Sequence, residues 1–442
     1  MACLVDSACV SIRVLAPLAR DTLVLDSYHA GKSTAVPASA NSAVLVALDF
    51  GERGYADAVA EFHLLCSSAG LTEQALVGGK RQKPDPAYYA GTGKMQEIAD
   101  AVAQTGAEIV VFNHILSPAQ QRNLEKKLNA RVIDRTTLIL DIFAQRAKSH
   151  EGKIQVELAQ LQHLATRLVR GWTHLERQQG GIGLRGPGET QLETDRRLLG
   201  VRVKLLREKL EKLQRQREVQ RRARNRGRVF SVSLVGYTNA GKSTLFNALT
   251  RADAYAADQL FATLDTTSRQ LHLPAAGNGA RGDQIVLSDT VGFIRELPTT
   301  LVAAFRATLE ETIHADLLLH VVDAASPARL EQIEEVNAVL KEIGADGVPQ
   351  ILIWNKIDAS VSEGSARYTA GLERDEYAKI SRLFLSAKSR DGLPFLRQAL
   401  TESVAGFKRG YQTDAGPDGS SAADRAAADE IFEVPVSAVS VF

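Results

Sequence analysis

The sequence predicts an α/β fold in which two α/β domains are joined by a long antiparallel helical hairpin. Short apolar runs alternate with amphipathic stretches near the start of the chain and again in its second half, a pattern typical of parallel sheets covered by helices. Between these regions, apolar residues recur at helical spacing through two long polar stretches. A length of 442 residues also exceeds what one compact core usually accommodates.

Residues 1–40 are expected to form a variable tail, because they are rich in Ala, Ser and Val and lack a persistent period. Gly31-Lys32-Ser33-Thr34 resembles the end of a phosphate loop, but Asp26 stands where the first glycine is required. Acidic residues interrupt any secretory core and are too frequent for a transit peptide. We therefore expect a cytoplasmic protein.

Residues 41–148 are predicted to form a small N-terminal α/β domain. Gly91-Thr92-Gly93-Lys94 could bind an anion at the start of a helix, but an ordinary turn into that helix is the favoured interpretation. The strand-like and helix-like segments are, in chain order, Val44–Leu48, Tyr55–Ser68, Met95–Gln104, Glu108–Phe112 and Arg131–Asp134.

Residues 149–228 are predicted to form the hairpin, with apolar seams from Ile154 to Leu168 and from Leu199 to Leu213. Its tip, residues 180–190, is dense in glycine, which lets backbone approach a partner closely. A flexible connector is the alternative, although a connector needs only a few residues. The tip residues that we expect to touch a partner are Gly180, Gly181, Gly183, Arg185, Gly186 and Gly188.

Charge is concentrated in the second half of the hairpin, although the whole chain carries a net charge of only +1. Val201–Arg228 holds twelve Lys or Arg residues against three Glu. Such clusters often meet nucleic acid, because binding releases counterions from phosphates. A solvated helix face is the alternative.

The overall composition, with 45% hydrophobic and 24% charged residues, is that of a soluble globular protein. The best apolar run, Ala43–Leu48, is too short to cross a bilayer, so we expect no membrane insertion and at most a peripheral association with membranes. Cys3, Cys9 and Cys66 lack metal-ligand spacing and are expected to pack rather than react.

The chemistry of the chain is predicted to lie in residues 229–405. An apolar strand, Phe230–Val235, leads into a phosphate loop, and the helical Leu245–Leu249 follows. In such a loop, backbone N–H groups surround the phosphates, Lys242 bridges the β- and γ-phosphates and Ser243 ligates Mg²⁺. The loop residues predicted to bind nucleotide are Gly236, Tyr237, Thr238, Asn239, Ala240, Gly241, Lys242 and Ser243.

Three further strand ends complete a guanine-nucleotide site. Asp289 is placed to reach Mg²⁺ through water and the Gly292 N–H to sense the γ-phosphate. Asp358 can accept from guanine N1–H and the exocyclic amine, where adenine offers no matching donors. The predicted binding residues at these ends are Asp289, Thr290, Val291 and Gly292, then Asn355, Lys356, Ile357 and Asp358, then Ser386, Ala387 and Lys388.

Together these residues resemble the HflX family of ribosome-associated GTPases, within the translation-factor-like class of P-loop GTPases. The resemblance covers residues 41–405 and includes the tip segment Gly180–Glu193. It also identifies a switch segment as nucleotide-binding, namely Phe261, Ala262, Thr263, Leu264 and Asp265. It implies a P-loop GTPase domain in which Thr263 completes the Mg²⁺ shell begun by Ser243.

The resemblance further implies that the hairpin docks on the large ribosomal subunit and its RNA, and that the protein splits stalled ribosomes, notably after heat stress. Lys242, Thr263 and Gly292 are the expected catalytic residues. Asn239 stands where some relatives hold K⁺ against the phosphates, although it could instead brace the loop. We expect a monomer when the protein is free.

Three departures from the family pattern affect these expectations. Thr266 stands where the family often has Pro, residues 1–40 match no segment of the family, and residues 406–442 are predicted to be a polar, mobile tail, which could be a divergent or truncated domain. Phe293 occupies the position of the water-orienting Gln of Ras-like enzymes. We therefore expect slow intrinsic hydrolysis that ribosomes stimulate.

Two other function classes compete with ribosome splitting. A GTP-gated scaffold that binds ribosomal RNA during assembly, without splitting activity, would show the same motifs. An RNA chaperone or helicase-like ATPase would also carry a basic hairpin, but Asn355 and Asp358 argue against adenine.

Overall fold

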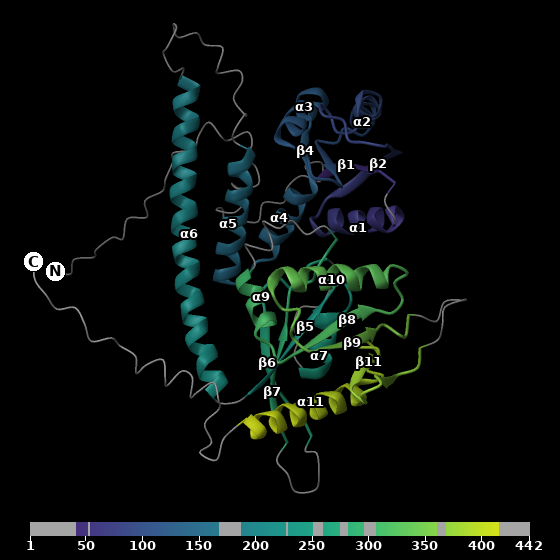
Figure 1. Ribbon diagram of the computed structural model, residues 1–442. Helices are drawn as coiled ribbons and strands as arrows, with labels where there is room; N and C mark the ends of the chain where they lie inside the picture. The colour runs from purple at the N-terminus through teal and green to yellow at the C-terminus, as the bar shows by residue number, and fades with distance from the viewer. Residues whose placement is uncertain are drawn as a thin grey trace, which may run out of the picture.

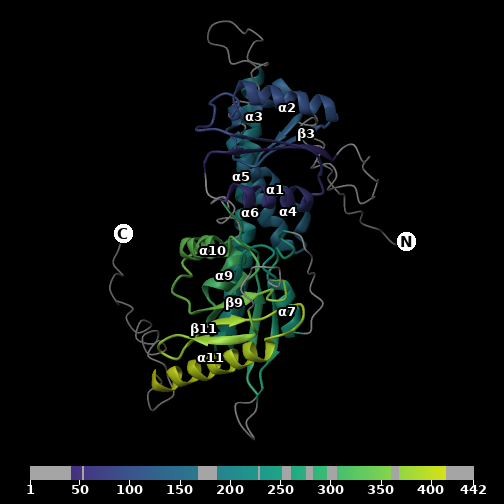
Figure 2. The same ribbon diagram turned by 90° about the vertical axis from the view of Figure 1, so that its right-hand side faces the viewer.

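The computed structural model describes residues 41–51, 54–167, 187–226, 229–250, 260–274, 282–295, 306–359 and 368–414. Two α/β domains lie one above the other, and the long helix α6 (Pro187–Arg226) runs along the side of both (Figure 1). The view turned by 90° shows the same stacking (Figure 2). This architecture confirms the predicted fold class. The predicted tail at residues 1–40 and the part of the predicted 406–442 tail after residue 414 lie outside the described residues.

The N-terminal domain contains a four-stranded parallel sheet in the order β2-β1-β3-β4. Side chains of β1 alternate between its faces: Leu45 packs with helices α1 and α4, and Val46 packs with α2 and α3. The elements are β1 (Ser42–Asp49), α1 (Tyr55–Ser68), β2 (Thr72–Lys80), α2 (Thr92–Thr105), β3 (Ile109–Phe112), α3 (Pro118–Leu128), β4 (Arg131–Ile133) and α4 (Arg135–Arg146).

Strand β2 has no counterpart in the sequence prediction. It pairs with β1 at the edge of the sheet, and several of its side chains are exposed. Its sequence therefore lacks the apolar run that marks a buried strand, and Gly78 and Gly79 weaken the strand signal further.

The hairpin consists of α5 (His150–Arg167) and α6, and the predicted apolar seams meet between them. Ile154 and Leu158 of α5 form a buried cluster with Leu206 and Leu210 of α6. Ion pairs flank this cluster on both sides, from Glu157 to Arg202 at 2.6 Å and from Glu151 to Arg217 at 2.8 Å. The two arms are thus joined by packing and by charge.

The glycine-rich tip is shorter than predicted, because its last four residues, 187–190, belong to α6. Pro187 is the first residue of that helix, a position where its fixed φ and missing N–H are tolerated. Gly188 therefore lies in the first turn of α6. The other predicted tip residues, Gly180, Gly181, Gly183, Arg185 and Gly186, lie outside the described part of the chain.

The second domain contains a seven-stranded sheet in the order β10-β11-β9-β8-β5-β7-β6. Strands β6 and β10 are antiparallel to their neighbours, and the other pairs are parallel. The strands are β5 (Phe230–Gly236), β6 (Thr267–His272), β7 (Gln284–Asp289), β8 (Leu317–Asp323), β9 (Gln350–Asn355), β10 (Gly371–Arg374) and β11 (Ile380–Phe384).

Helices cover both faces of this sheet. α7 (Lys242–Thr250) and α11 (Leu393–Asp414) pack in one apolar cluster, and α9 (Arg306–Ile313) and α10 (Arg329–Ile343) pack in another. The predicted domain end at 405 falls inside α11. The helix continues because Phe407 packs against Phe230, with ring centroids 5.1 Å apart, and Lys408 pairs with Asp283.

The two domains share one hydrophobic cluster, which has consequences for the site described below. Phe62 of α1 and Phe143 of α4 belong to the same cluster as Phe261, Val291 and Phe293 of the second domain. The segments predicted to sense the nucleotide are therefore packed against the N-terminal domain.

Candidate nucleotide site

The phosphate loop connects β5 to α7, as the sequence predicts. Gly236 and Gly241 have φ values of 145° and 92°, which side chains rarely adopt. A Cβ at Gly236 would lie 2.2 Å from the Val321 carbonyl oxygen, and one at Gly241 would lie 2.3 Å from Asn355 Nδ2. Both positions therefore require glycine, for backbone conformation and for space.

Lys242 is the first residue of α7 and is buried. Its Nζ donates to the backbone carbonyls of Gly236 at 3.0 Å and Tyr237 at 2.7 Å. Burial lowers the pKa of Lys242 to about 8, although the charge of Asp289 acts in the opposite direction. The ammonium group thus lies inside the ring of the loop, where a phosphate would meet it.

Three oxygen-bearing side chains from separate segments converge beside the loop. Ser243 Oγ lies 2.6 Å from Thr263 Oγ1 and 2.7 Å from Asp289 Oδ2, and Thr263 Oγ1 lies 3.0 Å from the same oxygen. Within the described residues, Asp289 Oδ1 has no hydrogen-bond partner although it is buried. Burial raises the pKa of Asp289, and the Ser243 hydroxyl and the Lys242 charge lower it.

Two hydroxyls and a carboxylate with a buried, unpartnered oxygen match the oxygen donors that Mg²⁺ prefers. These residues therefore fit the ion that the sequence predicts. Among the described residues, there is no group of three or more His, Cys, Asp or Glu that could hold a metal on its own.

The segment after β7 lies directly over the phosphate loop. Phe293 N donates to Gly236 O at 3.1 Å, and Thr238 N donates to Phe293 O at 2.7 Å. A Cβ at Gly292 would lie 2.8 Å from Thr238 Cγ2 and 3.0 Å from Lys242 Nζ. Gly292 is thus the close-approach point of this segment. Thr290, two residues before Gly292, is buried and donates to Leu234 O at 2.6 Å.

Phe293 is 1% exposed and belongs to the core shared by the two domains. Its side chain is apolar and points away from solvent, so it cannot orient a water molecule. A group other than Phe293 would therefore have to position the attacking water.

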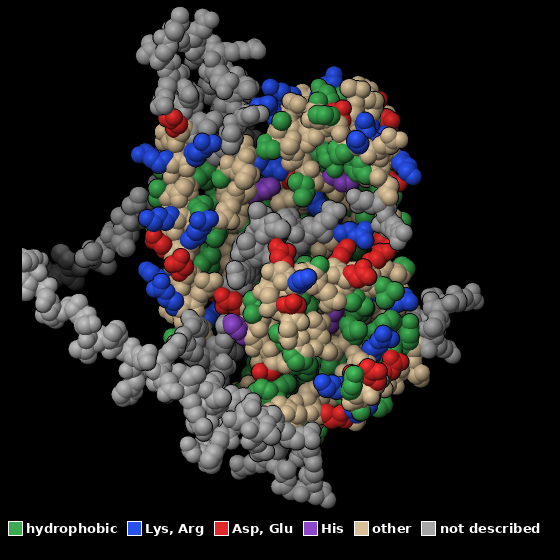
Figure 3. Space-filling view, viewed as in Figure 1, with side chains coloured by type: hydrophobic (Ala, Val, Ile, Leu, Met, Phe, Trp, Pro, Cys, Tyr) green, Lys and Arg blue, Asp and Glu red, His purple; other side chains and the backbone are tan. Residues whose placement is uncertain are grey.

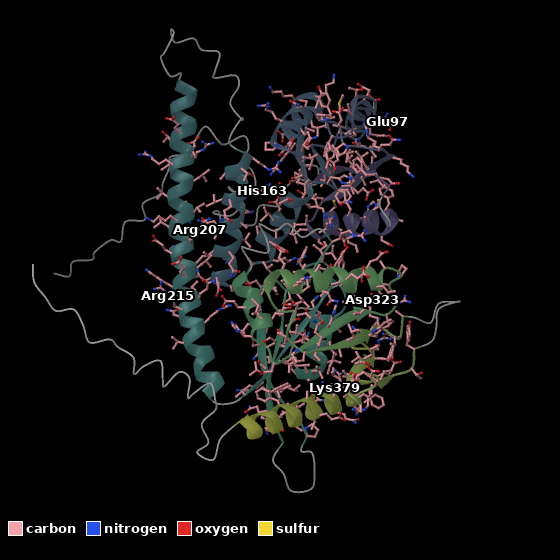
Figure 4. The ribbon with its side chains drawn as sticks, in the orientation of Figure 1. Glu97, His163, Arg207, Arg215, Asp323 and Lys379 are labelled. Carbon is pink, nitrogen blue, oxygen red and sulfur yellow. The ribbon has the colours of Figure 1, made fainter. Side chains whose placement is uncertain are left out.

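The base-recognition elements meet the phosphate loop through Asn355. Its Nδ2 donates to Ala240 O at 2.9 Å, and its Oδ1 accepts from Ala387 N at 2.9 Å. Lys356 has a φ of 63° and pairs with Asp323 at 2.8 Å. Asp323, which is labelled in Figure 4, is the last residue of β8. Asn355, at the end of β9, therefore links the loop after β5 and the segment after β11 into one unit.

The remaining predicted base-binding residues surround this unit. Ile357 and the exposed Asp358 follow β9 in a turn. Ser386 is buried and accepts from Ser389 N at 3.1 Å, and Lys388 is exposed in the same turn. The exposed Asp358 side chain lies where a purine could reach it, whereas Ser386 and Ala387 contribute backbone.

The switch I segment (residues 260–265) lies between the loop and the N-terminal domain. Phe261 has a φ of 56°, and its ring packs edge-on against Phe143 of α4, with centroids 4.6 Å apart. Leu260 N donates to Ser68 Oγ at 3.1 Å. Leu264 is buried in the shared core, and Ala262 is half-buried.

One predicted nucleotide-binding side chain points elsewhere. The Asp265 carboxylate accepts hydrogen bonds at the start of α5, from Lys148 N at 2.9 Å and Ser149 N at 2.7 Å. It is thus engaged by the base of the hairpin. The sequence gives no sign of this contact, because the partners are more than one hundred residues apart.

A second contact missed by sequence reasoning ties the loop to the N-terminal domain. The Tyr237 hydroxyl donates to Glu61 of α1 and accepts from Arg295 N at 2.7 Å. Arg135 of α4 pairs with the same glutamate at 2.5 Å and donates to Arg295 O at 3.1 Å. Burial and the charge of Glu61 raise the pKa of Tyr237, which keeps its hydroxyl protonated.

Comparison with known proteins identifies the family. Residues 56–144 match the GTP-binding GTPase N-terminal family, residues 146–224 the GTP-binding GTPase middle region, and residues 231–356 the 50S ribosome-binding GTPase family. The GTPase HflX of Escherichia coli (strain K12) is 55% identical over 383 residues, which is 87% of this chain and 85% of the relative. The chain belongs to the HflX family of GTPases.

A second HflX relative, from Magnetococcus marinus, is 50% identical over 341 residues and covers 77% of this chain and 76% of its own length. Among solved structures, this chain is similar to the crystal structure of SsGBP and GDP complex, with 25% sequence identity and a TM-score of 0.46. The match includes 83% of this chain and 99% of the SsGBP chain. Membership of the HflX family means that this protein binds GTP and hydrolyses it.

Among the described residues, no helix combines the length and the apolar character needed to cross a bilayer.

Proposed function

We propose that the protein is a GTP-driven factor that binds the large ribosomal subunit through its hairpin and separates stalled ribosomes into subunits under stress. The match of residues 231–356 to the 50S ribosome-binding GTPase family supports a ribosomal partner. The structural observation that carries the proposal is the hairpin itself.

Helix α6 contains 40 residues and is therefore about 60 Å long. Its N-terminal end, which carries the glycine-rich segment, lies level with the outer end of the N-terminal domain and away from the GTPase sheet (Figure 1). This distance from the GTPase sheet suits a probe that enters a ribosomal site while the GTPase domain remains outside.

The outer side of α6 offers charge for RNA. Lys and Arg side chains line it, with fewer Asp and Glu among them (Figure 3). Arg207 and Arg215, labelled in Figure 4, are exposed, and so are Lys204, Lys209 and Lys212. Release of counterions from phosphates would favour binding of this surface to ribosomal RNA.

The nucleotide roles proposed for the site follow from its geometry. Lys242 would hold the β- and γ-phosphates, and Ser243 and Thr263 would ligate Mg²⁺, with Asp289 acting through a water molecule. When bound, Mg²⁺ supplies a positive charge that offsets the charge of the phosphates. Asp358 would read guanine, braced by the contacts of Asn355.

The proposed catalysis is positional and electrostatic. Lys242, the amides of the loop and the Gly292 N–H would stabilise charge on the transferred group. Because Phe293 is buried, intrinsic hydrolysis is expected to be slow and to accelerate when a ribosome orders the switch segments. Comparing hydrolysis rates with and without ribosomes tests this step, and equal rates would contradict it.

A K⁺ ion beside Asn239 is proposed as a second cofactor. Asn239 is exposed and has a φ of 58° at the rim of the loop, where its side chain could help to hold a cation against the phosphates. Faster hydrolysis in KCl than in NaCl would support the ion. Equal rates would favour a role in bracing the loop.

Sucrose-gradient sedimentation tests the proposed function as a whole. Intact ribosomes are incubated with the protein and either GTP or a non-hydrolysable analogue, beside a variant lacking residues 180–188. We expect free subunits with the full protein and whole ribosomes with the variant. Co-sedimentation with the large subunit while ribosomes stay whole would overturn splitting and favour a GTP-gated assembly factor.

A further inference from the structure

The Asp265 carboxylate occupies the N-terminal end of helix α5. Besides the backbone N–H groups of Lys148 and Ser149, it accepts from Ser149 Oγ at 2.5 Å. Ser149 Oγ in turn accepts from Gly152 N at 2.8 Å. A carboxylate in this place satisfies donors at the start of the helix and is favoured by the helix dipole. Asp265 therefore caps α5 from a different domain.

Asp265 is only two residues from Thr263, whose hydroxyl lies in the proposed Mg²⁺ site. The two side chains thus face opposite ways from one short segment. Thr263 contacts Ser243 and Asp289 on the nucleotide side, whereas Asp265 contacts α5 on the hairpin side. Phe261 is fixed against α4 by its ring contact, so the segment has little freedom to move at one end alone.

The start of α5 is also where the two hairpin arms are tied together. Glu151, two residues after Ser149, pairs with Arg217 of α6 at 2.8 Å. The charge of Asp265 is close enough to contribute to the raised pKa of Glu151, although burial is the larger cause. A displacement of Asp265 would therefore disturb the point from which both arms extend.

We propose that Asp265 is a positioning residue that couples switch I to the hairpin: its cap on α5 and the placement of Thr263 at the Mg²⁺ site form together and are lost together. This inference rests on the proposed roles of Thr263 and of the hairpin. Coupling of this kind is reciprocal, so a partner that fixes the hairpin would favour the GTP-bound arrangement of switch I.

A substitution at Gly152 can break the contact between Asp265 and α5 without substituting any residue of switch I. A Cβ at Gly152 would lie 2.2 Å from Asp265 Oδ1, so Gly152→Ala must displace the carboxylate. Alanine otherwise favours a helix more than glycine does. Gly200→Ala in α6 is the matched control, because a Cβ there meets nothing within 4 Å. Asp265→Asn removes the charge and gives an independent variant should Gly152→Ala fail to fold.

The first readout is nucleotide discrimination by the full chain, without ribosomes and in the presence of Mg²⁺. We expect Gly152→Ala and Asp265→Asn to bind GDP like the parent protein and a non-hydrolysable GTP analogue about tenfold more weakly, within the usual range of coupling between sites. Gly200→Ala should match the parent. A purely structural cap would instead leave the ratio of the two affinities unchanged, and that result would overturn the proposal.

The second readout is the geometry of the hairpin. Spin labels at Arg207→Cys and Lys341→Cys, in a chain with Cys3 and Cys9 replaced by Ser, report the distance from α6 to α10. Cys66 is 2% exposed and its thiol pKa is raised to about 12, so it should stay unlabelled. We expect the distance to differ between GDP and the GTP analogue in the Gly200→Ala background, and to be the same in Gly152→Ala.

An equal nucleotide-dependent change in both backgrounds would overturn the coupling. Because neither readout uses ribosomes, a failure here is distinct from a failure of the splitting assay. A protein that couples the hairpin to GTP but leaves ribosomes whole would retain this inference and lose the proposed function.

Discussion

In both domains, a glycine and a lysine lie next to each other at the start of a helix near the carboxyl edge of the sheet. The two lysines differ in burial and in the groups that they contact. Lys94, beside Gly93 in α2, pairs with Glu97 one turn further along its own helix at 2.5 Å. Lys242, beside Gly241, is buried and donates to carbonyls of its own loop. A lysine that is kept buried without a carboxylate as its hydrogen-bond partner is available to a ligand.

The buried aspartates differ in the same way. Asp134 follows β4 and accepts from Thr137 N at 2.9 Å and Arg167 Nη2 at 2.5 Å. Asp289 ends β7 with one oxygen unpartnered within the described residues. Asp134 is thus paired within its own region, as in a structural network. The GTPase sheet leaves hydrogen-bonding capacity unused where a metal and phosphates would bind.

The largest expected effect separates the two lysines. Lys242→Ala should lower the rate of GTP hydrolysis by about 10³-fold, because it removes a buried positive charge from the transferring phosphate. Lys94→Ala should leave that rate within about twofold, since surface ion pairs contribute little. Steady-state phosphate release measures both variants. A comparable loss in Lys94→Ala would mean that the N-terminal sheet also acts on the nucleotide.

The aspartates should separate function from stability. Asp289→Asn should lower hydrolysis by roughly 10- to 100-fold, as expected for a residue that holds a metal through water. Asp134→Asn should instead lower the free energy of unfolding by about 3 kcal/mol, because it leaves the Arg167 charge with a weaker partner. Urea denaturation and phosphate release should be measured for both variants. The prediction is wrong if the two variants lose stability and hydrolysis rate to the same extent.

The smallest effect, taken per pH unit, is on the pH dependence of stability. The pKa of Lys242 in the folded protein is about 8, below its ordinary value of 10.5, so the unfolded chain binds more protons between these values. In the nucleotide-free protein, stability should therefore rise with pH across this window, by at most about 1.4 kcal/mol per pH unit. Urea unfolding from pH 7 to 10 should show this rise in the parent and a smaller one in Lys242→Met. If stability changed with pH equally in the parent and in Lys242→Met, the pKa of Lys242 would not be lowered in the folded protein.

Much of the GTPase site could be predicted because its signals are local. The strand, loop and helix around Lys242 occupy one continuous stretch, and Asn355 and Asp358 lie within one short motif at a strand end. Contacts between domains carry no such signal. Asp265 and Ser149, or Tyr237 and Glu61, are far apart in sequence, and each residue alone is ordinary.

Errors at element boundaries have a similar cause. The composition predicts a polar tail from residue 406 onwards, but packing of Phe407 on Phe230 continues α11 beyond that point. Strand β2 was missed because a half-exposed edge strand needs few apolar residues. In both places, tertiary contacts decide what the local composition leaves open.

The length of the hairpin makes it a lever arm. The Glu151–Arg217 pair marks its base, and Pro187 lies 30 residues further along α6, a distance of about 45 Å in a straight helix. A rotation of about 5° at the base would move that end by roughly 4 Å. In the proposed coupling, the apolar cluster between α5 and α6 would therefore have a mechanical role as well as a stabilising one, since a softer seam would absorb the rotation before it reached the far end.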